Sequence, residues 1–243
     1  IMVSLVMPNS YDHARTEREY GDMFRISEDV FGGGFDFVSQ RRRGQWQNGW
    51  ANWGNAFDGF IGFSDVAGRG QFIMDGDFIR LNTAESDSER QFWVSLMAIT
   101  GSPIAIADQY DTIGENAHFY QNEEILALNK AGFAARPLSM NCGQSRSSIW
   151  VGQLPDGDWV AGMFNREDSE QTMTVSFSKD LGFAKGTKAM VRDMWRRADL
   201  GEQEDMYRVS LQPHSCVVVR IKNPVKRYQC EVAGTCGGAK IVM

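Results

Sequence analysis

The 243-residue sequence predicts an α/β protein, namely the C-terminal portion of a (β/α)8 TIM barrel followed by an antiparallel β-sandwich. Over the first ~140 residues, short apolar runs alternate with helical patterns, as in parallel strands joined by helices. From Ile149 the apolar period changes to two, and turn residues separate short strands. The change falls near Pro137–Ser147, so we expect a barrel segment over residues 1–140, a sandwich over residues 141–224 and a third piece over residues 225–243.

The barrel segment is expected to contain three strands and three helices around a long irregular stretch. Apolar residues at helical spacing and a following glycine define the helices that end at Gly101 and Gly132. Residues 32–70 show little periodicity and predict a long loop or short helices, which in compact domains tend to be functional. In chain order the elements are a buried strand at Ile1–Met7, a helix at Glu17–Met23, strand Met23–Ile26, helix Ser88–Thr100, strand Pro103–Ala107 and helix Glu115–Lys130.

Six strands are expected in the sandwich. Pro155-Asp156-Gly157-Asp158 is a favourable hairpin turn between the first two strands. The predicted strands are Ile149–Leu154, Trp159–Asn165, Thr172–Phe177, Lys188–Asp193, Tyr207–Leu211 and Cys216–Ile221. Because the chain begins and stops inside strand-like runs, we expect it to be an internal fragment.

The charge and residue composition of the chain argue against several kinds of binding partner. Lys and Arg number 25 against 31 Asp and Glu, a net charge of −6, which disfavours binding to nucleic acid or to anionic membranes. The longest weakly charged stretch is interrupted at Thr100–Pro103, so no membrane insertion is expected. Three scattered histidines and four cysteines lack the spacing of a metal site, and no cofactor is expected. Whether Cys230 and Cys236 form a disulfide or stay free thiols is open.

Carboxylates after the predicted strands are the best candidates for chemistry. Glu28 and Asp29 follow one strand, and Asp75 and Asp77 occupy a loop. Residues just beyond the carboxyl ends of barrel strands face the active site. Together with Trp46, Trp50 and Trp53, whose rings can stack on a sugar, they suit glycoside hydrolysis. The alternative is that the aspartates shape a turn and the tryptophans belong to the core. The run Arg41-Arg42-Arg43 is expected to be a solvated loop.

The sequence resembles glycoside hydrolase family 27, the α-galactosidase and α-N-acetylgalactosaminidase family, in five motifs over about residues 1–222. In the family an Arg precedes the proton-donating Asp by four residues, as Arg25 precedes Asp29. Met74–Phe78 is similar to its Asn-Asp-Pro-Asp-Met loop, and Gly101–Ile104 to its Lys-Ser-Pro-Leu segment. The other two similarities are the helix segment Tyr120–Asn129 and the sandwich strands that end at Arg166 and Trp195.

The resemblance implies a retaining α-glycosidase in which Asp29 is the general acid/base. Arg25 would contact the sugar or hold Asp29, and Asp75 and Asp77 would bind substrate or organise the loop. The substrate would be an oligosaccharide or polysaccharide, and the localisation extracellular or periplasmic. The competing class is a non-catalytic carbohydrate-binding protein with a degenerate barrel.

Two departures from the family pattern affect activity and specificity. The family nucleophile lies in a Lys-x-Asp motif, which occurs nowhere in these 243 residues, so we expect it upstream of residue 1. Val6 and Met7 stand where the galactosidases have a sugar-binding Glu and a Trp. Galactose specificity is therefore open, and relatives acting on arabinopyranosides or α-glucans are alternatives. Residues 228–241 resemble the first strand of a family 6 or 35 carbohydrate-binding module.

Overall fold

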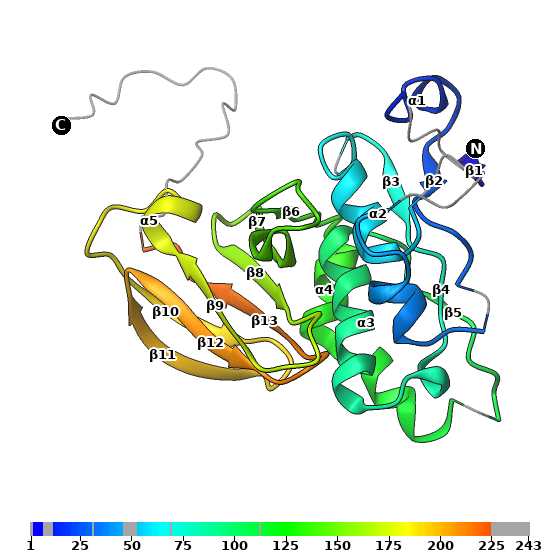
Figure 1. Cartoon of the computed structure of the whole chain (residues 1–243). Helices are drawn as coiled ribbons and strands as arrows, with labels where there is room; N and C mark the ends of the chain where they lie inside the picture. Colours follow the sequence, from blue (N-terminus) through cyan, green and yellow to red (C-terminus); the bar gives the residue numbers. More distant parts are fainter. Residues whose placement is uncertain are drawn as a thin grey trace, which may run out of the picture.

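The computed structural model describes residues 2–6, 12–30, 32–45, 53–68, 70–111 and 113–224. Figure 1 shows a β-sandwich on one side, the helices α2, α3 and α4 in the middle, and short strands β1 to β5 on the other side. The stretch that resembles a binding module, residues 225–243, lies outside the described residues, as do Cys230 and Cys236.

Short parallel strands form the N-terminal region. β1 (Ser4–Leu5), β2 (Met23–Arg25) and β3 (Ile73–Asp75) make one parallel sheet in that order. β4 (Phe78–Ile79) and β5 (Ala105–Ile106) form a second parallel pair. The register places Arg25 opposite Asp75, so the ends of β2 and β3 meet at one edge.

The first strand and the strand before Asp108 are shorter and more exposed than expected. β1 has two residues, and Val3 and Val6 on either side of it are exposed, so a buried strand at Ile1–Met7 is wrong for the described residues. β5 also has two residues, and Ile106 is 49% exposed. In both places, the described part of the chain provides no layer that covers the apolar run.

The helices are defined by their capping residues. α2 (Ala56–Phe63) starts where the Asn55 side chain accepts the Asp58 N–H, and α3 (Asp87–Thr100) starts where Ser86 accepts the Glu89 N–H. α3 ends at Gly101, whose φ of 76° is left-handed. The remaining helical elements are α1 (Glu17–Tyr20), the π-helix Asp36–Gln40, α4 (Glu123–Lys130), α5 (Phe177–Asp180), and the 3-10 turns Leu81–Thr83, Gly114–Gln121 and Ser145–Ser148.

A single helix over Glu115–Lys130 is wrong. The chain instead makes the 3-10 turn Gly114–Gln121 and then α4, with Asn122 between them. The Asn122 side chain accepts the N–H groups of Glu124 and Ile125, and its Nδ2 donates to the carbonyls of Met194 and Trp195. Asn122 therefore starts a new helix and fixes it to the sandwich in the same step.

The sandwich has all six expected strands and two more. The larger sheet has the order β11-β10-β13-β8-β7-β6, and β9 pairs with β12 in the second sheet. The strands are β6 (Arg136–Pro137), β7 (Ile149–Gln153), β8 (Trp159–Phe164), β9 (Gln171–Ser176), β10 (Lys188–Asp193), β11 (Ala198–Glu204), β12 (Met206–Leu211) and β13 (Cys216–Ile221). β11 is charged and lies at the sheet edge, which explains why apolar alternation did not predict it.

One hydrophobic core joins the sandwich to the N-terminal region, and a second core fills the sandwich. Phe92 of α3 packs edge-on against Phe164 of β8, with ring centroids 4.9 Å apart. A Cβ on Gly162 would lie 2.3 Å from Ile99 Cδ1, so α3 approaches β8 closely. Among the described residues, no helix is long and apolar enough to span a membrane.

Candidate active site

Arg25 gathers three carboxylates at the ends of β2 and β3. Its Nη1 lies 2.8 Å from Asp29 Oδ1 and 2.8 Å from Asp77 Oδ2. Its Nε lies 3.7 Å from Asp75 Oδ2 and makes no hydrogen bond with the described residues. The structure thus brings together Arg25, Asp29, Asp75 and Asp77.

Asp77 is the buried member of this group. Only 6% of its side chain is exposed, and its Oδ2 accepts the N–H of Val30 at 2.8 Å. Its backbone has a left-handed φ of 70°, and its N–H donates to Asp75 Oδ1. Burial raises the pKa of Asp77, although the Val30 N–H and Arg25 act in the opposite direction. Asp77 therefore organises the loop and anchors Arg25.

Asp29 is the exposed member, with 61% of its side chain in contact with solvent. It follows Ile26, where the chain leaves β2, and so it stands at the carboxyl edge of the parallel sheet. A carboxyl that is accessible and held by one guanidinium can exchange a proton with a bound ligand. This placement suits a general acid/base better than that of Asp75 or Asp77.

Glu28, beside Asp29, is the buried partner in an ion pair with Arg41. Its side chain is 3% exposed and accepts a hydrogen bond from Arg41 Nε. Its backbone N–H donates to the Trp53 carbonyl at 3.0 Å. Neither the Arg41 partner nor the burial of Glu28 was predicted, because residues 13 positions apart in an irregular segment show no spacing signal.

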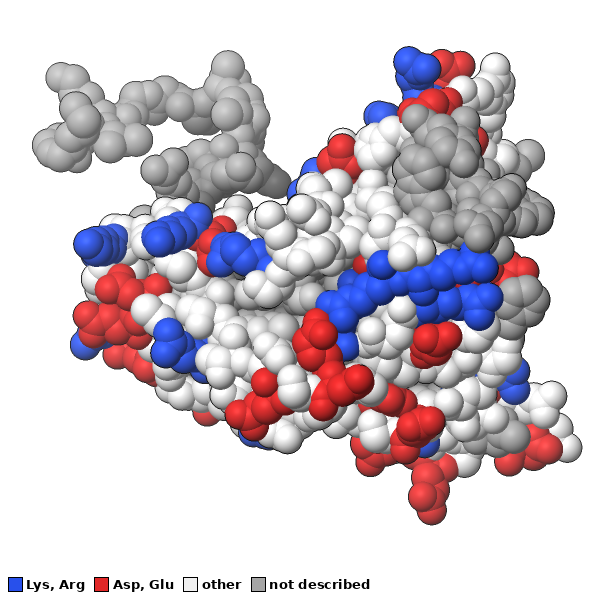
Figure 2. Space-filling view, in the orientation of Figure 1, with Lys and Arg blue, Asp and Glu red and all other residues white. Residues whose placement is uncertain are grey.

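The segment Arg41–Arg43 is not a solvated loop, so that expectation is wrong. Arg41 lies over the Phe37 ring at 4.8 Å, and Arg43 Nη2 lies 2.5 Å from Glu167 Oε1 of the sandwich. Figure 2 shows a band of basic atoms with acidic side chains around it on one face, so the surface there is not uniformly negative.

The tryptophans give a mixed result. Trp46 and Trp50 lie outside the described residues, so their role as sugar-stacking rings stays a prediction. Trp53 is partly buried against the core, and a Cβ on Gly62 of α2 would lie 2.3 Å from Trp53 Nε1. Trp53 therefore packs as a core residue.

Other nucleophilic or metal-binding groups are scarce in the portion of the chain that the structure describes. There, no group of three His, Cys, Asp or Glu side chains could hold a metal ion. Burial raises the pKa of both Cys142 and Cys216 to about 12, so neither thiol is an activated nucleophile. Carboxylate chemistry is left as the best candidate.

The chain is similar in sequence to known glycoside hydrolases. Residues 144–221 match the α-galactosidase C-terminal β-sandwich domain. The chain is 43% identical to isomalto-dextranase from Arthrobacter globiformis over 98% of this chain and 38% of that protein. The resemblance to the family 27 clan is confirmed. The chain thus spans well under half the length of this relative.

Solved structures support the same fold. The isomalto-dextranase of Arthrobacter globiformis T6, complexed with panose, superposes with a TM-score of 0.84 at 42% identity, over 92% of this chain and 38% of that one. A family 27 β-L-arabinopyranosidase from Geobacillus stearothermophilus gives a TM-score of 0.68 at 22% identity, over 93% of this chain and 50% of that one. The predicted fold, the C-terminal portion of a barrel followed by a sandwich, is confirmed.

Proposed function

We propose that this chain supplies the general acid/base of a retaining α-glycosidase. The observation that carries the proposal is Asp29, exposed at the end of β2 and paired with Arg25 at 2.8 Å. Asp29 protonates the leaving glycosidic oxygen and later removes a proton from the attacking water. A carboxylate from a segment outside this chain forms the glycosyl-enzyme bond, roughly 5–5.5 Å from Asp29, as in retaining enzymes.

Arg25 has two roles in this proposal. It holds Asp29 through Nη1, and the 18% of its side chain that is exposed can meet the sugar. Asp75, with 21% of its side chain exposed, can accept a hydrogen bond from a sugar hydroxyl beside it. We assign Trp46 and Trp50 to the sugar-stacking side of the same site.

We propose an α-linked glucan of the dextran type as substrate. The support is the 43% identity to isomalto-dextranase and the residue Val6 directly after β1, whose side chain cannot hydrogen-bond a hydroxyl. A site without such a partner leaves a sugar hydroxyl unpaired, at a cost of about 1–3 kcal/mol. Because a polymer of this kind does not cross membranes, we propose an extracellular or periplasmic location.

We propose the sandwich as a second domain over residues 141–224, after the barrel segment of residues 1–140, whose last strand, β6 (Arg136–Pro137), adds to the larger sandwich sheet. Support comes from the sheet pattern: strands β1 to β5 pair in parallel, whereas β6 to β13 pair antiparallel. Residues 225–243 stay assigned to the start of a carbohydrate-binding module.

A substrate panel on the complete enzyme tests the function. We expect kcat/KM to be highest on isomalto-oligosaccharides and lower on nitrophenyl α-galactoside, β-L-arabinopyranoside and α-N-acetylgalactosaminide. A strong preference for the simple galactoside would contradict the glucan proposal. Binding of dextran without hydrolysis of any α-glycoside would favour the non-catalytic class.

A further inference from the structure

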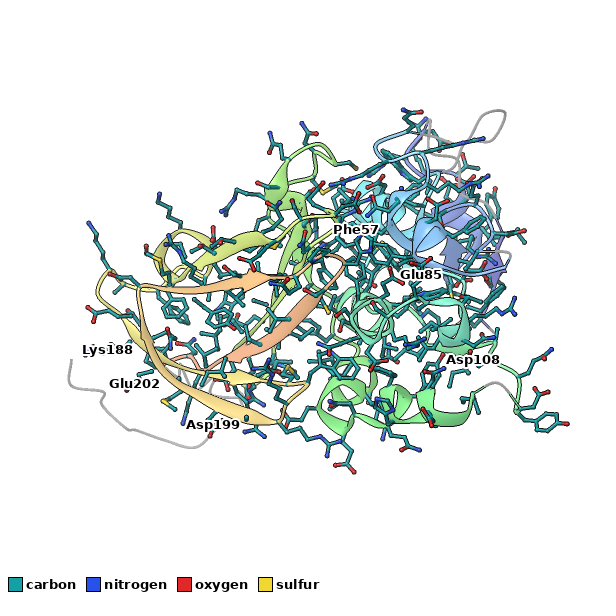
Figure 3. The ribbon with its side chains drawn as sticks, turned by 60° about the horizontal axis from the view of Figure 1, so that its bottom comes forward. Phe57, Glu85, Asp108, Lys188, Asp199 and Glu202 are labelled. Atoms are coloured by element: carbon teal, nitrogen blue, oxygen red, sulfur yellow. The ribbon has the colours of Figure 1, made fainter. Side chains whose placement is uncertain are left out.

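A fully buried ion pair connects the sandwich to the barrel segment. Arg166 follows β8, and its Nη1 lies 2.7 Å from Asp58 Oδ1 in α2; both side chains are 0% exposed. Arg166 Nε donates to Ser39 Oγ at 2.9 Å, and its guanidinium lies 4.4 Å from the centre of the Phe57 ring. Figure 3 shows Phe57 where the sandwich ribbon meets the N-terminal region.

Asp58 also connects Arg166 to the segment that contains Arg41. Its second oxygen, Oδ2, accepts the Gly44 N–H at 2.6 Å and Asn55 Nδ2 at 2.7 Å. The same Asn55 Nδ2 donates to the Arg41 carbonyl at 2.9 Å. Asp58, which Arg166 neutralises, thus holds the Gly44 N–H directly and the Arg41 carbonyl through Asn55.

Further contacts tie the sandwich to the same segment. Glu167 pairs with Arg43, and the Arg166 carbonyl accepts a hydrogen bond from Gln40 Nε2. Arg166 and Glu167 therefore meet residues on both sides of Arg41.

Arg41 links this set of contacts to the candidate active site. Its Nε pairs with the buried Glu28, the residue directly before Asp29. α2 also presses on the exit of β2, because a Cβ on Gly59 would lie 2.4 Å from the Ile26 carbonyl oxygen. A shift of α2 or of segment 39–44 would thus move the backbone that presents Asp29.

We infer that Arg166 is a positioning residue for the acid/base Asp29, acting through Asp58 and Arg41, so that the sandwich takes part in catalysis. This inference rests on the proposed role of Asp29. Misplacing a catalytic group by about 1 Å costs roughly 100-fold in rate. A misplaced Asp29 donates its proton to the leaving group more slowly. The loss in rate is therefore larger for a leaving group that needs a proton.

The leaving-group dependence of the rate separates positioning from stability. In the complete enzyme, Arg166→Met should lower kcat/KM, which reports formation of the glycosyl-enzyme, on an unactivated isomalto-oligosaccharide by about 10- to 100-fold. On the dinitrophenyl α-glycoside of the same sugar, whose leaving group needs no protonation, kcat/KM should fall far less. A variant that merely folds less would lose both rates equally.

Companion variants keep the test decisive. If Arg166→Met does not fold, Arg166→Lys and Arg41→Gln should show the same selective loss, because Lys keeps the charge without the forked donors. Arg192→Met is the matched control, since Arg192 pairs sandwich strand β10 with Glu124 of α4 at 2.7 Å. It should leave the ratio of the two rates unchanged.

The Asp29→Asn variant shows whether the acid/base assignment of Asp29 or the positioning role of Arg166 is wrong. If Asp29→Asn lacks the selective loss, the proposed acid/base is wrong. If Asp29→Asn shows it but Arg166→Met and its companions lose both rates equally, the positioning role of Arg166 is wrong.

Discussion

The N–H of Val30 donates to Asp77 Oδ2 at 2.8 Å, and this bond ties the loop after β3 to the loop after β2. Asp29 lies in the loop after β2, directly before Val30, so the buried Asp77 holds the backbone next to the exposed Asp29. Arg25, between them, contacts both carboxylates. The Asp29 carboxyl can thus stay accessible to a ligand while the neighbouring backbone is held by a buried hydrogen bond.

Asp29→Asn tests the assignment of the acid/base. In the complete enzyme we expect a loss of roughly 10²–10⁴-fold on natural glycosides, the usual contribution of a general acid–base. Stability should change little, because the Asp29 side chain is mostly exposed. Steady-state kinetics together with thermal unfolding check both points, and wild-type turnover would show that another carboxylate is the acid.

Asp77→Asn tests the raised pKa of that carboxyl. Because burial raises it above the ordinary 3.8, the folded protein holds the proton more tightly than the unfolded chain does. The contribution of Asp77 to stability is therefore greatest below its ordinary pKa and declines as pH rises through the raised value. The free energy of unfolding, measured against pH, should show this decline in the wild type and not in the variant. Parallel curves would contradict the shift.

Asp58→Asn tests the buried pair. Removing the charge leaves the Arg166 guanidinium buried without its counter-charge, which costs about 3–5 kcal/mol. Replacing both partners by apolar residues should cost less than the sum of the two single changes. Chemical denaturation of the variants at Asp58 alone, at Arg166 alone and at both positions gives the coupling free energy between the two side chains. Additive losses would mean that the pair contributes little.

Gly59→Ala tests the contact of α2 with β2. The new methyl group would meet the backbone oxygen of Ile26 at 2.4 Å, and a backbone atom cannot move aside cheaply. We expect a loss of about 1–3 kcal/mol from overpacking, despite the better helix propensity of alanine. Gly32→Ala is the control, since nothing lies within 4 Å of its Cβ position. Equal unfolding midpoints for both variants would rule out the close contact.

Much of the architecture can be predicted from the sequence because it depends on local signals. Helix α3 was expected at Ser88–Thr100 and is found at Asp87–Thr100, closed by Gly101. Alternating apolar residues predicted six sandwich strands, since one face of each strand is buried. The resemblance to family 27 implied that Arg25 contacts the sugar or holds Asp29, and the structure shows the Arg25–Asp29 pair at 2.8 Å.

By itself, the sequence determined the fold class, the helix that ends at Gly101 and the candidate carboxylates that follow the predicted strands. Only the tertiary structure decided that Arg166 pairs with Asp58, 108 positions away, and that Asn122 divides one predicted helix by bonding to Met194 and Trp195. The physical reason is that composition favours solvated charges, whereas the packing of α2 and the sandwich excludes water from both partners of the ion pair.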